Sequence, residues 1–196
     1  MSIYREMLEE WLKGLSIRCD TCLDIGGGAK PVKDRVKKWK VKNYHIWDDC
    51  VEAQALYVQD KCDNYKVLDI QSVSPSLLAD NKNYYEKAFM LEVAEYLWNP
   101  IDALINIWIV MKKGGTFYSS WPFIYPLHRP IEADCLRYTD QGIYKLLRRA
   151  RFVKVKIKPR VATKGLGNLL QFYKSEGMHV AGNSHHIGYL VEATKK

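Results

Sequence analysis

Hydrophobic residues recur along the chain with two spacings, and each spacing predicts one kind of element. Near the start they return every three or four positions, which predicts an amphipathic helix over residues 2–15 with Ser2 as its N-cap. Later they form short apolar runs bounded by polar residues or glycine, which are typical of buried strands. Seven strands are expected, at residues 22–25, 44–47, 66–68, 88–91, 116–120, 153–157 and 187–193.

Helices are predicted between several of these strands. One has Asn99 as its N-cap and Pro100 as its first residue, and the lysine–glycine run 112–115 is expected to close it. Another runs from Thr139 to about Arg151, and a short one lies around residues 169–173. The inward face of the longer helix is formed by Ile143, Leu146, Leu147 and Ala150. Strands that alternate with helices predict an α/β protein with a largely parallel sheet.

Carboxylates gather at the ends of the first four predicted strands. Asp24 stands one residue before the end of the first, and Asp48, Asp69 and Glu92 follow the next three. Three glycines, residues 26–28, directly follow the first strand. Because ligands of such sheets bind beyond the carboxyl ends of the strands, we expect these residues to line one crevice.

The glycine loop is compatible with two kinds of ligand, a dinucleotide and S-adenosylmethionine. Glycine allows a close backbone approach, and the N-terminus of a following helix would offer N–H groups to an anion. A pyrophosphate favours a third glycine for helix packing, but Lys30 occupies that position and Pro31 has no N–H. This favours the smaller anion. Asp48 suits a ribose diol in either ligand, and Asp69 with Ile70 suits an adenine.

These segments resemble the class I S-adenosylmethionine-dependent methyltransferases over roughly residues 18–194. Residues 24–28 resemble the first motif of the family, residues 92–97 its fourth-strand segment, and residues 111–115 the glycine pair before its fifth strand. Residues 128–139 are similar to a segment found in one broad branch of the family. The resemblance implies the cofactor S-adenosylmethionine and the cofactor-binding residues Asp24, Gly26, Gly27, Gly28, Asp48, Asp69, Ile70 and Glu92.

The resemblance also implies a fold: a Rossmann-like seven-stranded sheet in the order 3-2-1-4-5-7-6, with strand seven antiparallel and helices on both faces. Three positions depart from the family pattern. Lys30 replaces a glycine, Glu86 stands where aspartate is usual, and Tyr96 stands where histidine is frequent. Of these, Lys30 bears directly on the geometry of the loop.

Methyl transfer is an in-line displacement, so positioning supplies much of the catalysis, and a base is needed only if the acceptor keeps its proton. His128, in the loop after the fifth strand, is the candidate base, and its alternative is a loop histidine bonded to backbone or solvent. Trp121 and Tyr125 are expected either to wall an acceptor pocket or to pack the loop. Arg137 would hold an anionic acceptor or pair with Asp134.

Length and composition limit the classes of protein to which the chain can belong. The 196 residues, 47% hydrophobic and 27% charged, fit one globular domain over residues 1–196, with an insertion at about 159–186. The longest apolar run, residues 107–111, is too short to span a membrane, and the acidic N-terminus does not read as a secretory signal. Five scattered cysteines favour reduced thiols and a cytoplasmic setting. No pattern indicates an oligomeric state.

The net charge of +8 is concentrated in two basic stretches, residues 30–42 and 148–160, which suit nucleic acid, an acidic substrate or an anionic surface. Solvated faces of ordinary elements are the alternative, and the alternation of Val and Ile with Lys in 153–158 predicts a half-buried strand. Residues 19–22 contain Cys-x-x-Cys without a second pair, and His179, His185 and His186 suit a polar loop, so no metal is expected.

We therefore expect methyl transfer from S-adenosylmethionine to a small molecule or glycan. Base-amine and C5-pyrimidine methylation lack their motifs, since no Pro-Cys pair and no Asp/Asn-Pro-Pro-aromatic run occurs. A protein or RNA acceptor ranks behind. The alternative is a catalytically decayed binding module that uses the basic stretches on nucleic acid or a partner protein, and a nicotinamide oxidoreductase is disfavoured by Pro31.

Overall fold

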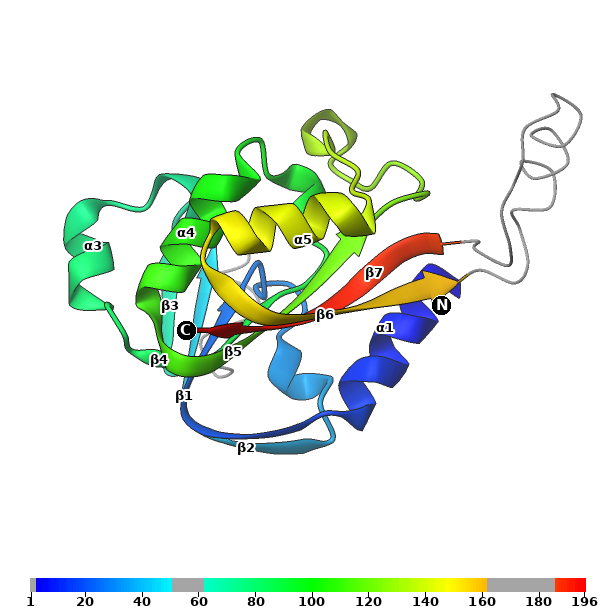
Figure 1. The fold of residues 1–196 in the computed structure, drawn as a ribbon. Helices are drawn as coiled ribbons and strands as arrows, with labels where there is room; N and C mark the ends of the chain where they lie inside the picture. Colours follow the sequence, from blue (N-terminus) through cyan, green and yellow to red (C-terminus); the bar gives the residue numbers. More distant parts are fainter. Residues whose placement is uncertain (1–2, 51–61, 162–185) are drawn as a thin grey trace, which may run out of the picture.

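The computed structural model describes residues 3–50, 62–161 and 186–196. Within these ranges the chain forms a seven-stranded sheet in the order β3-β2-β1-β4-β5-β7-β6 (Figure 1). Strand β7 is antiparallel to β5 and β6, and the other neighbours are parallel, which confirms the predicted order. The strands are β1 Ser16–Ile25, β2 Lys38–Asp48, β3 Asn64–Val67, β4 Tyr85–Met90, β5 Met111–Pro122, β6 Phe152–Val161 and β7 His186–Lys195.

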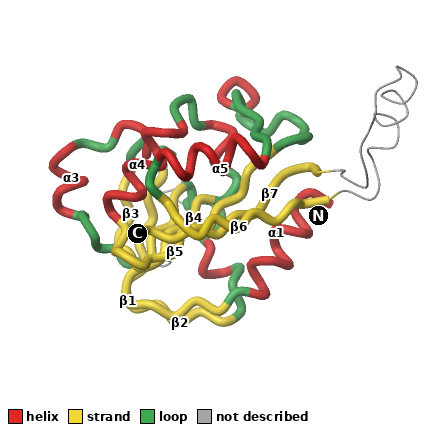
Figure 2. The backbone as a smooth tube through the Cα atoms, in the orientation of Figure 1, coloured by secondary structure: helices red, strands yellow, loops and turns green. Residues whose placement is uncertain are grey.

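Helices cover both faces of the sheet, α1 on one and α4 with α5 on the other (Figures 1 and 2). The helix α3 packs beside α4. Four short 3-10 helices lie in the connections that the structure describes. The α-helices are α1 Ile3–Gly14, α3 Pro75–Asp80, α4 Pro100–Val110 and α5 Asp140–Arg149, and the 3-10 helices are η1 Val32–Asp34, η2 Ile70–Ser72, η3 Ala94–Tyr96 and η4 Ile131–Ala133.

Each face of the sheet has its own hydrophobic core. Helix α1 buries Leu8 and Leu12 completely, as the helical spacing predicts. On the other face α4 buries Leu104 and α5 buries Ile143 and Leu147, again with no exposed surface. Fully burying a side chain of this size stabilises the fold by about 2 kcal/mol. The expected N-cap, Ser2, lies outside the described residues.

The helix α4 ends earlier than the sequence suggests. The prediction that residues 112–115 close it is wrong, because the chain passes directly from Val110 into β5 at Met111. The glycine pair serves the sheet instead. Gly114 has a φ of +78°, and a Cβ on Gly115 would lie 2.9 Å from the carbonyl oxygen of Glu86 in the neighbouring strand. Asn99 and Thr139 stand at the expected N-cap positions of α4 and α5, and Thr139 accepts a hydrogen bond from the N–H of Gly142.

No α-helix follows the glycine loop, although one was expected there. Residues 26–37 contain only the three-residue η1 before β2 begins. The reason is geometric. Lys38 pairs with Ser16, so the connection must return along the whole of β1, a distance of about 30 Å for ten residues of strand. Twelve residues of α-helix would span only about 18 Å. The connection is therefore largely extended.

Several further predicted features lie outside the described residues. The expected helix at 169–173 belongs to the segment 162–185, as do most of the expected insertion and the histidines at 179 and 185. Of that insertion, residues 159–161 extend β6 and His186 begins β7. Among the residues that the structure does describe, no helix has the length and apolar character needed to cross a membrane.

Candidate functional site

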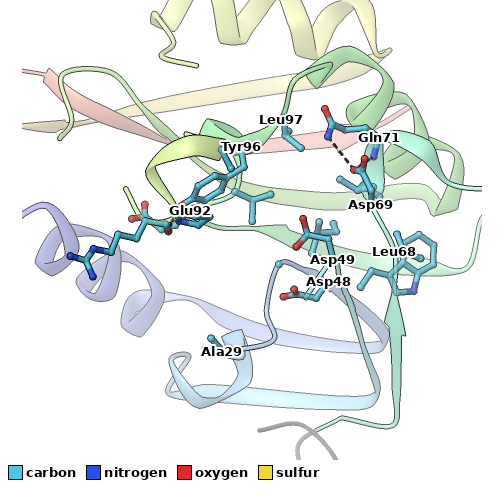
Figure 3. A pocket seen from close by; sticks show the side chains of 17 residues that line it. Ala29, Asp48, Asp49, Leu68, Asp69, Gln71, Glu92, Tyr96 and Leu97 are labelled. Atoms are coloured by element: carbon cyan, nitrogen blue, oxygen red, sulfur yellow. Dashed lines mark hydrogen bonds between the residues drawn. The ribbon is translucent and has the colours of Figure 1, made fainter. Parts of the chain in front are cut away.

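A cavity of about 390 Å³ opens at the carboxyl ends of β1, β2 and β4, beside the end of β3. Its floor is apolar, and carboxylates stand around it (Figure 3). The predicted residues that line it are Gly26, Asp48, Asp69, Ile70 and Glu92. The expectation that acids at successive strand ends share one crevice is thus met by three of the four, with Asp24 as the exception.

Gly26 is the point at which the loop turns over the cavity. Its φ is +73°, and a Cβ there would lie 2.2 Å from Cγ2 of Val93, so only glycine fits without rearrangement. Its N–H donates to the carbonyl oxygen of Trp47 at 2.8 Å. The loop is thereby fixed to the end of β2, next to Asp48.

Asp48 holds the two loops that border it. One carboxylate oxygen accepts from the N–H of Gly28 at 2.8 Å and the other from the N–H of Cys50 at 2.9 Å. The side chain is 8% exposed and still faces the cavity, with Asp49 beside it (Figure 3). Each carboxylate oxygen has a second lone-pair site, so Asp48 can accept further hydrogen bonds from a ligand.

The opposite end of the cavity combines an apolar wall with a polar rim. Ile70, 4% exposed, and Leu97 form the wall. Asp69 is exposed at the rim and accepts from the backbone N–H of Gln71 at 2.8 Å and from its side-chain amide at 3.1 Å (Figure 3). The side-chain oxygen of Gln71 in turn accepts from the N–H of Asn99 at the start of α4. Gln71 was not among the predicted site residues.

Glu92 lines the cavity, but its carboxylate is already bound by protein groups. One oxygen accepts from Arg160 at 3.1 Å and from Ser120 at 3.2 Å, and the other accepts from the hydroxyl of Tyr125 at 3.1 Å. Arg160 comes from β6 and has no exposed surface. Its charge therefore belongs to a buried ion pair. The solvated face suggested for the basic stretch 148–160 does not include Arg160. Glu92 itself adopts a φ of +57°.

Asp24 is a structural residue of the loop and does not line the cavity. Its carboxylate, 2% exposed, accepts from the N–H of Val32 at 2.8 Å and from the hydroxyl of Tyr44. Burial raises the pKa of Asp24 to about 6, and these two donors act in the opposite direction. A Cβ on Gly27 would lie 2.2 Å from the same carboxylate. Asp24 thus shapes the turn, and of the three glycines only Gly26 reaches the cavity.

His128 lies behind Tyr96, which lines the cavity. The Tyr96 hydroxyl donates to the carbonyl oxygen of Arg129 at 2.6 Å. The Tyr96 hydroxyl oxygen also lies 2.6 Å from Nδ1 of His128. A hydroxyl has one hydrogen and a carbonyl can only accept, so Nδ1 is the donor in this pair. The neutral imidazole then carries its free lone pair on Nε2.

Glu95 is a buried carboxyl group that the sequence analysis did not single out. It lies in η3, is 2% exposed, and places Oε1 3.6 Å from Nδ1 of His128. Its Oε2 has no hydrogen-bond partner among the described residues. Burial and the nearby Glu92 carboxylate raise the pKa of Glu95 to about 8. The group therefore keeps its proton at neutral pH.

The three residues predicted to contact an acceptor do not line the cavity. Trp121 has no exposed surface and packs edge-to-face on Tyr138, so the expectation of an acceptor wall is wrong for this residue. Tyr125 is half-buried and donates to Glu92. Arg137 forms a two-pronged ion pair with Asp134, one arm at 2.9 Å, which is the local pairing that its position suggested.

Searches with known proteins find similarity in structure alone. No family model matches the sequence, and no curated protein matches it. A solved complex of the Haloferax volcanii methyltransferase activator Trm112 with a methyltransferase superposes with a TM-score of 0.66 at 16% identity, covering 98% of this chain and 89% of the other. A Thermotoga maritima SAM-dependent methyltransferase gives 0.65 at 13%, with coverages of 99% and 91%.

A third solved structure contains bound molecules. Geranyl diphosphate C-methyltransferase from Streptomyces coelicolor, solved with Mg²⁺, geranyl diphosphate and S-adenosyl-L-homocysteine, gives a TM-score of 0.62 at 13% identity, covering 98% of this chain and 81% of the other. What all three share with this chain is the overall fold, at 13–16% sequence identity. The chain therefore has the fold of the class I S-adenosylmethionine-dependent methyltransferases.

Proposed function

We propose that this protein transfers a methyl group from S-adenosylmethionine to an acceptor of the small-molecule or glycan class. The observation that carries the proposal is the cavity at the carboxyl ends of the first strands, where Asp48 faces an apolar wall formed by Ile70 and Leu97. Its volume of about 390 Å³ lies within the range of small-ligand sites. The fold, shared with enzymes of this reaction, supports the same assignment.

The lining residues fit the parts of the cofactor in order. Asp48 and the adjacent Asp49 would accept from the ribose hydroxyls, and Asp69 would accept from the adenine amine, with Ile70 and Leu97 against the ring. The bound cofactor would supply an electrophilic methyl group. The carboxylates of this wall also favour a ligand that carries a sulfonium charge.

Proton removal, where the acceptor needs it, is assigned to His128. Its Nδ1–H is held by the Tyr96 oxygen, which fixes the ring and leaves Nε2 as the basic atom. Glu95 lies 3.6 Å away on the Nδ1 side, and because it keeps its proton at neutral pH it adds no negative charge beside the ring. Tyr96 occupies the cavity wall between this pair and the bound cofactor, so it would also position the acceptor.

A decayed binding module is the second candidate, and one observation favours it. The extended connection 26–37 lacks the helix N-terminus that the glycine loop was expected to present to an anion. Lys154, Lys156 and Lys158 are exposed along the edge strand β6, where nucleic acid could contact them. Lysines on an edge strand also prevent edge-to-edge aggregation, so their presence alone does not require a ligand.

Calorimetric titration with S-adenosylmethionine and S-adenosylhomocysteine tests the proposal. We expect wild-type protein to bind both in the micromolar range, Asp48→Ala to lose binding, and Asp80→Asn to bind like wild type. Asp80 is a matched control because it is an exposed acid at the end of α3. Absence of binding to both compounds by folded wild-type protein would refute the methyltransferase proposal and favour the binding module.

A further inference from the structure

The glycine loop lacks the partner that an anionic ligand group finds at the start of a helix. The only helical turn in residues 26–37 is η1, three residues long. Two loop amides are already used, since the N–H of Gly28 donates to Asp48 and that of Val32 donates to Asp24. Pro31 has no N–H to offer. An aligned set of free amides, which would attract a carboxylate, is therefore missing.

The charges that line the cavity further disfavour a carboxylate near the glycine loop. Asp48, Asp49 and Glu92 lie on the side of the cavity that adjoins the loop. They suit hydroxyl and cationic groups and would repel a carboxylate placed near the glycines. In the part of the chain that the structure describes, the N–H groups of Gly27 and Ala29 make no hydrogen bond, and these neutral donors do not offset that repulsion.

The cationic side chains around the loop differ in whether they already have a partner. Arg5 and Arg35 both pair with Glu9, at 3.6 Å and 2.9 Å. Lys30 forms no hydrogen bond or ion pair with any residue in the described ranges. It directly follows Ala29, which lines the cavity, and its side chain is exposed.

The electrostatic surroundings of Lys30 agree with this placement. Partial burial and the charges of Arg5 and Arg35 lower the pKa of Lys30, whereas Glu9 and Glu92 act to raise it. Positive charges that are crowded together in this way are relieved when an anion binds among them.

We propose that the Lys30 ammonium group binds the carboxylate of the S-adenosylmethionine amino-acid tail, replacing the helix N-terminus that the extended 26–37 connection excludes. The inference rests on the proposed function, because it assigns one group of the same ligand. It gives Lys30 a role in selecting ligands with a carboxylate over those without one. It also explains why lysine is compatible with a position where a helix would have required glycine.

The test compares two ligands that differ only in this group, S-adenosylmethionine and its decarboxylated form, by calorimetric titration. We expect Lys30→Gln to weaken binding of S-adenosylmethionine about tenfold, as for loss of a charge-assisted hydrogen bond, and to leave the decarboxylated ligand unchanged. Lys30→Arg should retain most of the preference. Lys37→Gln is the matched control, because it removes an exposed charge from the same connection.

The outcomes separate this inference from the proposed function. Wild-type binding of S-adenosylmethionine that Lys30→Gln does not change, or that it weakens equally for both ligands, would overturn the role of Lys30 alone. So would the same ligand-selective loss in Arg129→Gln, since Arg129 also lines the cavity. Wild-type protein that binds none of the compounds would overturn the proposed function and this inference together.

Discussion

Glu95 makes the stability of the protein depend on pH in a way that one substitution should remove. The side chain is 2% exposed, and its pKa rises from an ordinary 4.5 to about 8. The folded chain therefore holds a proton that the unfolded chain releases between these two values. Stability from this group is fully present below about pH 4.5 and is lost as the pH rises through 8.

The size of the effect follows from the shift. Each pKa unit corresponds to about 1.36 kcal/mol, and integrating the linkage relation over the experimentally convenient interval from pH 5 to pH 9 gives a loss of about 4 kcal/mol. Glu95→Gln keeps the shape of the side chain and cannot titrate. The free energy of unfolding of the variant should therefore gain about 4 kcal/mol on that of wild type across this interval.

Urea unfolding followed by tryptophan fluorescence, at pH 5, 6, 7, 8 and 9, measures this difference. Glu132→Gln serves as the control, because Glu132 is exposed and lies close by in η4. Its curve should run parallel to that of wild type. If the Glu95→Gln curve also runs parallel, burial does not hold Glu95 protonated, and the conclusion that Glu95 keeps its proton at neutral pH is refuted.

Two further substitutions test how the cavity is built. Gly26→Ala should destabilise the fold by about 1–3 kcal/mol and abolish ligand binding, because a Cβ at φ +73° meets Val93. Urea unfolding and calorimetric titration measure the two effects, and a variant that binds the ligand like wild type would refute the prediction. Arg160→Met should lower the free energy of unfolding by about 3–5 kcal/mol, because it leaves Glu92 without its guanidinium partner. Adding Glu92→Gln should restore much of that loss, and additive losses in the double variant would contradict the ion-pair argument.

The sheet could be predicted because its central strands are buried on both faces. Residues 22–25 are apolar apart from Asp24 and residues 88–91 are all apolar, and the structure pairs the two segments as parts of β1 and β4. Positions at strand ends followed from the same reasoning, which is why Asp48, Asp69 and Glu92 were expected in one crevice. The outer halves of the strands could not be recognised in this way. Residues 16–20 and 38–43 alternate with exposed polar side chains and belong to strands only because they pair with each other.

Buried charged residues and buried aromatic residues are the features that the sequence did not predict. Nothing in the sequence separates Arg160 and Glu95 from charged residues at exposed positions, and only tertiary contacts remove them from water. Trp121 was assigned to an irregular loop, but β5 continues to Pro122, so the indole packs within the sheet and donates to Ser119 at 2.8 Å. Sequence patterns report which elements form. They do not report which side chain of an element a distant strand will cover.

The extended connection between β1 and β2 links these observations. The pairing of Ser16 with Lys38 sets the length that residues 26–37 must span, and that length excludes an α-helix. Without a helix there is no N-terminal dipole at the glycine loop, so a third glycine has no helix to pack against. A lysine at position 30 is then free of the constraint that glycine satisfies elsewhere in this fold. The same argument disfavours a dinucleotide. One ammonium group can serve as the partner of one carboxylate, but it cannot replace the several N–H donors that a pyrophosphate needs.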